Sequence, residues 1–562
     1  MRFSDRRRLL YLYLREGWRR FSRRLAVGRI SALRFAGSAP TRLIVAPTDL
    51  HSVDSHAAQE ILAGRFPLAG RVLECDGESP FSLELPSEPF AERLHAFGWL
   101  RHMRAAPADK AGPFARRIVD EWTQGHGRVI GGVAWRPDVI SLRIIAWLSH
   151  SPVVLKDADY GFYRRFLKTL AFQVRYLKHV ADTTRDGEIR LRVRIALAMA
   201  SLAMPASAAV IRRAARNLDR ELERQILPDG GHVSRNPRVG LDLLLDLLPL
   251  RQTYVNLGHD SPQRLISCID RLYPALRFFR HQGGELALFN GATHTLANEL
   301  ISVLRYDETS GPPFRTLPQT GYERLSCGET VVLVDAGKPL SDELSATASA
   351  GCLSFEMSSG KHRFVVNSGM PRFAGAEIRR LSRATAAHSV ATLNDTSSSR
   401  ISSSRFLGPI LTGGVTEVKA SRYEGQDGAT GLTASHDGYA GDFGLIYERD
   451  IYLNAKGNEI RGRERFLQTN GGAPQPSNGD VAVVRFHIHP SIRIVPVGEN
   501  EVRLVAPDGE LWVLTCLDAP ILEEEDVFFA DPSGVRAARQ LAVTMRVGDL
   551  PEIQWLMTHR SG

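Results

Sequence analysis

The hydrophobic periodicity of this chain changes once, at the segment SGPPFRTLPQTG, residues 310–321. From about residue 110 to residue 310, apolar side chains recur every three or four positions, which is the spacing of one face of an α-helix. After residue 321 they alternate with polar side chains, as in a β-strand with one buried face. We therefore predict a helical unit followed by an all-β unit.

Three helices are well marked in the first unit. Residues 160–181 place apolar side chains along one face of a helix. A second helix is predicted over 207–227, and it ends at PDGG, where proline and glycine do not continue a helix. The third follows Ser261–Pro262, a typical helix start, and ends at Gly283–Gly284. Helices of this length, joined by short breaks, predict stacked helical hairpins.

The second unit contains short strand-like segments in close succession. They are ETVVLVDAG, CLSFEMSS, HRFVVNSG, LIYERDIYLN, EIRGRERFL, VAVVRFHIHP, VRLVAPDG and LWVLTC. The sequences SSGK, NAKGN and APDG between them are typical of hairpin turns, which favours an antiparallel sandwich. We divide the chain into a basic N-terminal segment (1–35), a mixed region (36–105), a helical domain (106–312) and a β-sandwich domain (318–562).

The N-terminal segment carries much of the chain's positive charge. The 562 residues include 71 basic and 62 acidic ones, a net charge of +9, which is compatible with an anionic partner. Residues 1–35 combine many arginines with the apolar run LLYLYL, which is too short for a secretory signal. We predict either an amphipathic helix in peripheral contact with anionic lipid or a solvated helix docked on the protein.

Several common site types lack support in the sequence. No apolar run approaches the roughly 20 residues of a membrane-spanning helix. The five cysteines are scattered and form no C-x-x-C pair, which argues against a disulfide framework and a thiolate zinc site. Fingerprints of a P-loop, a dinucleotide site, a zincin and a serine hydrolase are missing. We expect no cofactor and no nucleic-acid partner.

An ordered set of phrases resembles the heparinase II/III-like family of polysaccharide lyases. The phrases are ILAGRFPLAG, GGVAWRPDVISLRIIAWLSH, ILPDGGHVSRNP, LSFEMSSGKHRFVVNSG, SRATAAHSVATLND, SHDGYAG and VRFHIHP. The resemblance implies an incomplete α/α toroid followed by a large antiparallel β-sandwich, with an acidic polysaccharide or oligosaccharide bound between them. It also implies a cell-envelope or periplasmic location, although the chain has no recognisable export signal, so a cytoplasmic or peripheral membrane location is the alternative.

The family's chemistry is β-elimination at a uronic acid, and the sequence departs from it at the expected positions. The reaction needs a group that neutralises the carboxylate, a base and an acid. Where the resemblance places an Asn or His, this chain has Glu188 and Ile189, and where it places a Tyr, Val239 and Gly240 stand. Of the zinc ligands found in some members, only His388 remains, so we predict no metal.

Eight residues remain as candidates for a site. His232, His388 and Tyr439 are candidate catalytic groups, and His388 has a hydrogen-bonded structural role as its alternative. Candidate substrate contacts are Arg235, Asn236, Arg383, Trp135 and Asn290. Two functions therefore stay open: a lyase-like enzyme acting on an acidic polysaccharide, and a non-catalytic carbohydrate-binding or envelope-structural protein on the same fold.

Overall fold

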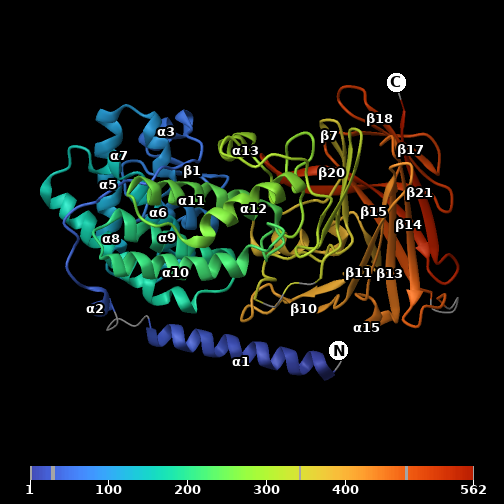
Figure 1. Ribbon diagram of the computed structural model, residues 1–562, viewed down its shortest axis with the longest axis horizontal. Helices are drawn as coiled ribbons and strands as arrows, with labels where there is room; N and C mark the ends of the chain where they lie inside the picture. Colours follow the sequence, from blue (N-terminus) through green and yellow to red (C-terminus); the bar gives the residue numbers. More distant parts are fainter. Residues whose placement is uncertain (1–2, 27–31, 339, 341–342, 475–478, 561–562) are drawn as a thin grey trace.

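The computed structural model describes residues 3–26, 32–338, 340, 343–474 and 479–560. Helices fill one half of an elongated molecule and two large sheets fill the other (Figure 1). A separate helix, α1 (Phe3–Ala26), runs along the lower edge in this view and is followed by the short α2 (Ala32–Phe35). The predicted order of a helical unit and then a β unit is confirmed.

The region before the toroid mixes short helices with one hairpin. It consists of α3 (Ser55–Leu62), β1 (Arg65–Leu68), β2 (Arg71–Glu74), α4 (Glu88–Ala96) and the 3-10 helix η1 (Gly98–Ala105). α3, β1 and α4 supply buried residues to the same hydrophobic core as the toroid helices. This region is therefore packed onto the toroid and has no separate core.

The toroid is made of nine helices joined by loops of different lengths. They are α5 (Ala108–His126), α6 (Pro137–Ser149), α7 (Ser151–Leu155), α8 (Tyr160–Val180), α9 (Glu188–Ala203), α10 (Ala208–Gln225), α11 (Pro237–Asn256), α12 (Gln263–Phe279) and α13 (Ala297–Leu304), with short 3-10 turns η2 (Val133–Trp135) and η3 (Ala181–Thr183). The three helices predicted from the sequence correspond to α8, α10 and α12. α9 packs against α6, α10 and α11, which explains why it is apolar on most of its surface.

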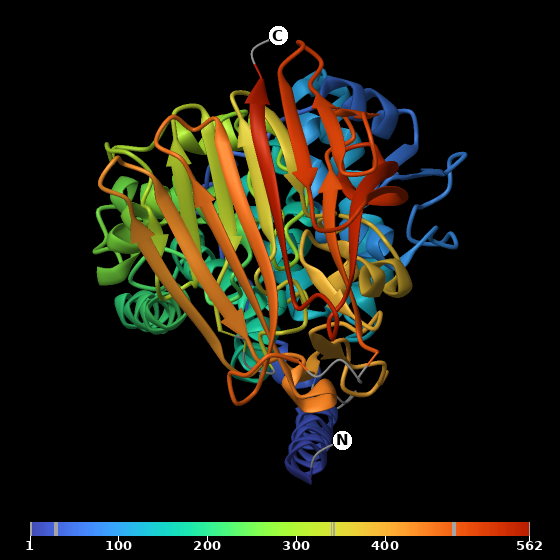
Figure 2. The same ribbon diagram turned by 90° about the vertical axis from the view of Figure 1, so that its right-hand side faces the viewer.

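The sandwich consists of two antiparallel sheets (Figure 2). One has the order β11-β12-β13-β14-β21-β18-β17-β16, and the other β19-β20-β15-β7-β6-β5-β4-β3, with β8 paired to β15. Their bounds are β3 (Thr316–Leu317), β4 (Tyr322–Cys327), β5 (Thr330–Asp335), β6 (Phe355–Ser359), β7 (His362–Val366), β8 (Ala391–Leu393), β11 (Val418–Glu424), β12 (Thr430–His436), β13 (Leu445–Leu453), β14 (Glu459–Gln468), β15 (Val481–Ile488), β16 (Arg493–Pro496), β17 (Glu501–Val505), β18 (Leu511–Cys516), β19 (Ile521–Asp531), β20 (Gly534–Arg546) and β21 (Glu552–Arg560).

Each strand-like segment predicted from the sequence overlaps one of these strands. Short elements interrupt the β half: α14 (Ala376–Leu381), η4 (Thr385–Ala387), the hairpin β9 (Ser399–Ile401) and β10 (Leu411–Gly414), and α15 (Ala440–Phe443). Within the described ranges, no helix combines the length and apolarity needed to cross a membrane.

Strand β5 separates the two main hydrophobic cores. Val331 and Leu333 belong to the core that includes the toroid helices. Val332 and Val334, whose side chains point to the other face of the strand, belong to the sandwich core. Because both faces of β5 are covered, its sequence is an unbroken apolar run instead of an alternating one. The β4–β5 region is therefore where toroid and sandwich meet.

Candidate functional site at the toroid–sandwich junction

The loop after α10 fixes how the toroid meets the sandwich. The Asp229 carboxylate accepts hydrogen bonds from the backbone N–H groups of Gln319 and Thr320 at 2.8 and 2.7 Å. Gly230 has a φ of 83°, and a Cβ atom there would lie 1.9 Å from the carbonyl oxygen of Arg271. Only glycine fits this position. The PDGG sequence thus ends α10 and also joins the two halves.

Arg235 extends from this loop into the sandwich. Its guanidinium donates hydrogen bonds to the carbonyl oxygens of Thr320 at 2.7 Å and Gly321 at 3.1 Å, and it forms a buried ion pair with Asp335 at the end of β5. It also lies 4.9 Å from the ring centre of Tyr322. Burial alone lowers the pKa of Arg235, but the Asp335 carboxylate outweighs burial and holds the pKa above its usual value.

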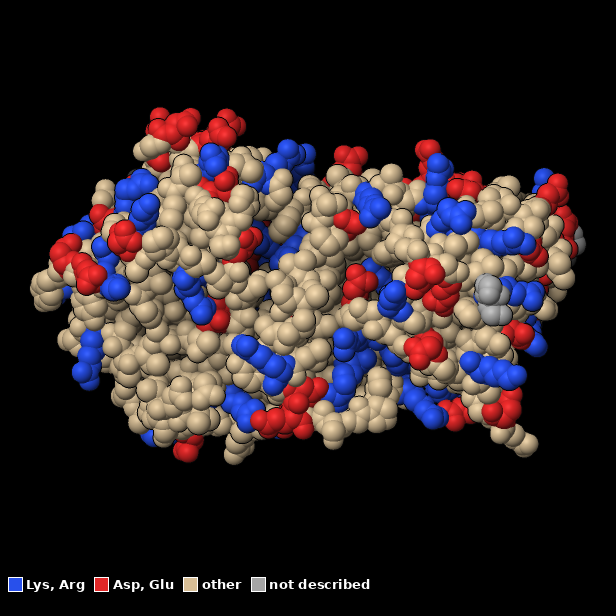
Figure 3. Space-filling model, turned by 90° about the horizontal axis from the view of Figure 1, so that it is seen from above, with Lys and Arg blue, Asp and Glu red and all other residues tan. Residues whose placement is uncertain are grey.

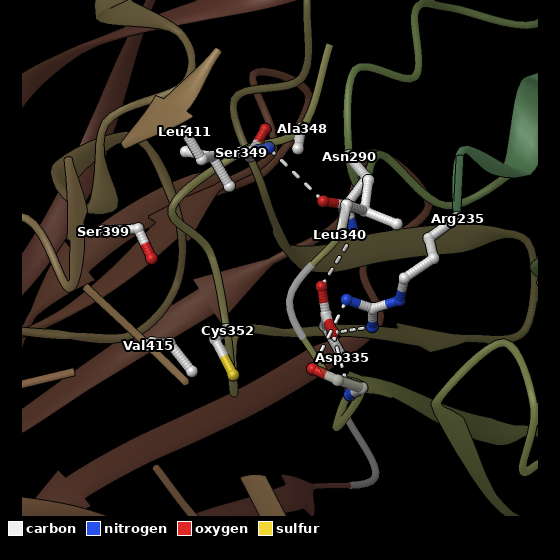
Figure 4. A pocket seen from close by; sticks show the side chains of 11 residues that line it. Arg235, Asn290, Asp335, Leu340, Ala348, Ser349, Cys352, Ser399, Leu411 and Val415 are labelled. Atoms are coloured by element: carbon white, nitrogen blue, oxygen red, sulfur yellow. Dashed lines mark hydrogen bonds and ion pairs between the residues drawn. The ribbon is translucent and has the colours of Figure 1, made fainter. Parts of the chain in front are cut away.

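Asn290 completes this buried group (Figure 4). Its amide nitrogen donates to the second carboxylate oxygen of Asp335 at 2.9 Å and to the Tyr322 hydroxyl at 2.7 Å. Beside these side chains lies a cavity of about 20 Å³, lined also by Ser349. That volume suits about one water molecule, so the junction at Arg235 and Asn290 does not admit a sugar ring.

His232 and Asn236 have local partners in the same loop. The His232 Nδ1 accepts the backbone N–H of Ser234 at 3.1 Å, so its Nε2 carries the proton and donates to Gln225 Oε1 at 2.9 Å. Burial lowers the pKa of His232 to about 3, and Arg192 adds to the shift. Asn236 accepts the N–H of Arg238 at 2.9 Å and caps α11. Both side chains therefore stabilise the loop.

His388 and Arg383 lie inside the sandwich half. The His388 Nδ1 donates to the Ala384 carbonyl at 2.8 Å, and burial lowers the pKa of this imidazole to about 4. Arg383 was predicted to contact a substrate. Instead its guanidinium donates to the carbonyl oxygens of Ala348, Pro409 and Ser345 at 2.6–2.8 Å. These hydrogen bonds connect the segment that carries Arg383 to residues 345–348 and to Pro409.

Tyr439 and Trp135 are core residues in the structure. The Tyr439 hydroxyl donates to the Ala391 carbonyl at 2.9 Å, and the side chain is 1% exposed. Burial raises the pKa of this phenol. Trp135 is 3% exposed and packs edge-on against Tyr176 at 5.1 Å. The prediction that Trp135 contacts a substrate does not agree with this position, because helices cover its ring.

The positions that correspond to the family's zinc site do not suit a metal. Gly351 packs against the His388 ring, and a Cβ atom at residue 351 would lie 2.5 Å from His388 Cδ2. Asn367 uses its side-chain oxygen to accept the N–H of Ser389. In the part of the chain that the structure describes, no group of three or more His, Cys, Asp or Glu side chains is placed to hold a metal ion. We therefore derive no chemistry through zinc.

A network of opposite charges links α9, α11 and α13, and sequence reasoning did not anticipate it. Arg192 lies 2.8 Å from Glu188 and 3.2 Å from Asp246. Arg238 lies 3.1 Å from Asp242 and 2.6 Å from Glu299. Burial raises the pKa of Glu188, although Arg192 opposes the shift. The i, i+4 spacing of Glu188 and Arg192 was the signal in the sequence that could have revealed part of this network.

Comparison with known proteins decides the family. Residues 309–556 match the model described as "Heparinase II/III-like, C-terminal". FtsZ-localized protein C of Caulobacter vibrioides is 31% identical over 547 residues, covering 94% of this chain and 92% of that protein. This chain belongs to the heparinase II/III-like family.

Solved structures of the family share the whole fold. Heparinase III superposes with a TM-score of 0.73 at 13% identity, covering 94% of this chain and 89% of the other. A mutant of the heparan sulfate lyase HepC from Pedobacter heparinus gives 0.62 at 16% identity, covering 92% and 85%. The incomplete α/α toroid and antiparallel β-sandwich implied by the sequence phrases are therefore confirmed.

Proposed function

We propose that this heparinase II/III-like protein is a non-catalytic, peripheral membrane member of its family that works where FtsZ is found. The observation that carries the proposal is an apolar stripe on α1 that faces away from the rest of the protein. The name of the related Caulobacter protein, which records localisation with FtsZ, supports the cellular location.

The outer face of α1 has the properties of a membrane-interface helix. At about 3.6 residues per turn, Leu10, Tyr11, Leu14, Trp18 and Phe21 share one side of the helix. All five are exposed, Leu14 by 66% and Trp18 by 71%. Such a row of large apolar side chains beside arginines is typical of helices that lie in the headgroup region of an anionic bilayer.

The opposite face of α1 attaches the helix to the body. Leu12 is buried against Leu407 and Ile410, in a small cluster separate from the two main cores. Arg20 donates to the Phe406 carbonyl and lies over the Phe406 ring at 4.4 Å. The helix is thus held in one orientation, and its apolar stripe stays directed outward.

The surroundings of the candidate catalytic residues support a non-catalytic role. His232, His388 and Tyr439 are 3%, 2% and 1% exposed, and each has a hydrogen-bond partner within the protein. A polymer bound at the surface cannot reach a buried acid or base. Glu188, which stands where the family has Asn or His, carries a negative charge when ionised and would repel a uronate carboxylate.

Vesicle cosedimentation tests the membrane proposal. The full chain should sediment with anionic vesicles and less with neutral ones, and added salt should weaken binding because charges are screened over about 10 Å at 0.1 M. A chain that begins at Pro40 should stay in the supernatant. The double variant Leu14→Glu/Trp18→Glu should behave like the shortened chain.

A matched control uses the same substitution at exposed apolar positions on the toroid. Val255 and Ile301 are 63% and 65% exposed, so Val255→Glu/Ile301→Glu should sediment like the wild type. Equal sedimentation of the full and shortened chains would overturn the role of α1. A fluorescent fusion that follows FtsZ only when α1 is intact would extend the result to the cell.

The alternative is the lyase that the family and fold imply, acting by β-elimination on an acidic polysaccharide. Its product carries a conjugated double bond that absorbs at about 235 nm. Incubation with a panel of uronic-acid polymers should give no rise in absorbance at this wavelength. A rise that disappears in His232→Gln or Tyr439→Phe, variants of two candidate catalytic residues, would establish catalysis and contradict the non-catalytic part of the proposal.

A further inference from the structure

Four consecutive acidic residues lie on β19, the edge strand of the second sheet. Successive side chains of a strand point to opposite faces, so the four divide into two pairs. Glu523 and Glu525 share one face with Arg539, at 3.7 and 3.8 Å. Glu524 and Asp526 share the other face, where no lysine or arginine of the described chain forms an ion pair with them. Two carboxylates on this face therefore have no basic side chain to neutralise them.

A glutamine and a histidine on the neighbouring strands bind these two carboxylates. Gln540 of β20 lies directly opposite Glu524, and His487 of β15 lies directly opposite Gln540. The Gln540 Nε2 donates a hydrogen bond to Glu524 at 2.8 Å. The His487 Nδ1 lies 2.6 Å from the Asp526 carboxylate, and it donates because an ionised carboxylate only accepts. Glu524, Gln540 and His487 thus form one row across three strands, with Asp526 beside it.

The second polar atom of each of these two side chains has no partner. Gln540 is 9% exposed and His487 is 1% exposed, yet the Gln540 Oε1 and the His487 Nε2 form no hydrogen bond with the residues that the structure describes. Both atoms are acceptors, because the amide nitrogen and Nδ1 carry the protons. A buried acceptor without a donor destabilises the fold unless a ligand or a water molecule supplies the hydrogen bond. The row therefore presents four acceptors: two carboxylates, an amide oxygen and an imidazole nitrogen.

Two arginines that share this face of the sheet have other partners. Arg485, two positions before His487, donates to the Thr392 hydroxyl at 2.5 Å, and Arg536 of β20 lies 3.5 Å from Asp531. Figure 3 shows acidic and basic side chains interspersed over the upper face of both halves, and the net charge of the chain is +9. The overall charge therefore does not attract a cation, and recognition of one depends on this local row of acceptors.

We propose a binding site for a primary ammonium group on an alkyl chain, as in a polyamine or a lysine side chain, formed by Glu524, Asp526, Gln540 and His487. A primary ammonium offers three N–H donors and no acceptor, and its charge is opposite to that of the two carboxylates. Leu522 stands on the same face of β19 and is 52% exposed, so the methylene groups have an apolar surface to pack on. Because β19 is an edge strand, the ligand reaches the row from the side of the sheet. The site does not include α1, so it goes beyond the membrane proposal.

Thermal unfolding of the full chain, with added cations at matched ionic strength, tests the site. Putrescine and a lysine capped at both backbone ends carry primary ammonium groups, whereas tetramethylammonium has the charge but no N–H donor. We expect at least one of the two amines to raise the unfolding temperature in a saturable way, and tetramethylammonium to have no such effect. A stronger response to putrescine identifies a free polyamine as the ligand, and a stronger response to the capped lysine identifies a protein side chain.

Substitutions on the two faces of β19 give a matched comparison. Glu524→Gln removes a carboxylate from the row and should weaken the apparent affinity for the amine about tenfold, through loss of one charge-assisted hydrogen bond. Glu525→Gln makes the same change one position further along, on the face of Arg539, and should keep the full response. Gln540→Met removes the unpartnered amide oxygen and should weaken binding less, because both carboxylates stay in place.

Three results would overturn the site. The first is no response to any of the cations, which would mean that only water occupies it. The second is an equal response to tetramethylammonium, which would mean attraction by charge alone. The third is equal affinity in Glu524→Gln and Glu525→Gln. The chain that begins at Pro40 should respond like the full chain, so a failure of the membrane proposal would leave this test intact.

Discussion

Two contacts between distant parts of this chain use the same residue types in opposite settings. At the toroid–sandwich junction, Arg235 pairs with Asp335, and their side chains are 9% and 5% exposed. At the attachment of α1, Arg15 pairs with Glu343, and their side chains are 40% and 39% exposed. The first pair is desolvated and surrounded by further hydrogen bonds, whereas the second is screened by water.

The difference separates a permanent contact from a reversible one. A buried charge that loses its partner keeps its desolvation cost, so the junction has no stable half-open form. An exposed pair contributes about 0–1 kcal/mol and exchanges readily for contacts with water or lipid headgroups. The toroid and sandwich should therefore unfold together, while α1 should detach from a folded body.

The largest effect is expected from Arg235→Met. The substitution leaves the Asp335 charge buried without its cation and should lower the free energy of unfolding by about 3–5 kcal/mol. Urea denaturation followed by tryptophan fluorescence measures this, since Trp122 and Trp147 are buried in the toroid core. Addition of Asp335→Asn should recover part of the loss.

The matched control is Arg315→Met, because Arg315 forms an exposed pair with Glu424. This substitution should lower the free energy of unfolding by less than about 1 kcal/mol. Similar losses in Arg235→Met and Arg315→Met would contradict the comparison.

Low pH should lower the stability of the toroid and sandwich through protonation of His232 in the unfolded state. This titration should not affect α1. The pKa of folded His232 is about 3, below the roughly 6.5 of an unfolded histidine. The unfolded state therefore takes up a proton first, and stability falls as the pH decreases from about 6.5 toward 3. For this one residue the loss by pH 5 is about 2 kcal/mol.

Comparison of His232→Gln with the wild type isolates this contribution. The variant should lose about 2 kcal/mol less than the wild type between pH 7.5 and pH 5, measured by urea denaturation at each pH. Equal losses would show that His232 takes up its proton in the folded protein. Residues 3–26 contain no histidine, so binding of α1 to vesicles should not change through histidine titration over this range.

The sequence predicted the fold much better than the site, and particular residues show why. Periodicity located α8, α10 and α12 and the strand in each predicted segment, because burial of one face repeats along the chain. The partners of Arg235 include Thr320, Gly321 and Asp335, which lie 85 to 100 residues away. No local pattern encodes a contact over that distance.

The same reasoning explains the errors on single residues. His232 was predicted to be catalytic and Asn236 to contact a substrate, yet both side chains hydrogen-bond to backbone groups of their own loop. The strand ETVVLVDAG ends in an aspartate, and that buried Asp335 was the available signal for a polar junction.

Truncation of the buried Leu12 side chain should detach α1 and leave the toroid and sandwich folded. Leu12 is 4% exposed and lies at the centre of the small cluster under the helix. Leu12→Ala should cost about 2 kcal/mol locally, which corresponds to roughly thirtyfold faster hydrogen exchange in α1. The urea midpoint of the body should stay unchanged. The control is Leu10→Ala, at a position that is 61% exposed, which should leave the hydrogen-exchange rate of α1 unchanged. If Leu12→Ala instead lowers the urea midpoint, α1 unfolds together with the toroid and sandwich.

The smallest effect on stability is expected from Glu16→Gln, and it should have the opposite sign for membrane binding. Glu16 lies 2.9 Å from both Arg19 and Arg20. Burial tends to raise its pKa, but hydrogen bonds from the two arginines outweigh burial and lower it. The stabilisation is therefore present above the unfolded pKa of about 4.3 and disappears below it. At pH 7 the variant should lose about 0.2–1 kcal/mol of local stability, and less in high salt.

The same variant should bind anionic vesicles more strongly, because it has lost one negative charge. The expected gain is about 1 kcal/mol, measured by cosedimentation. If the variant instead binds these vesicles more weakly than the wild type, α1 needs its attached orientation more than its charge, and the contact with the body would then be part of the membrane site.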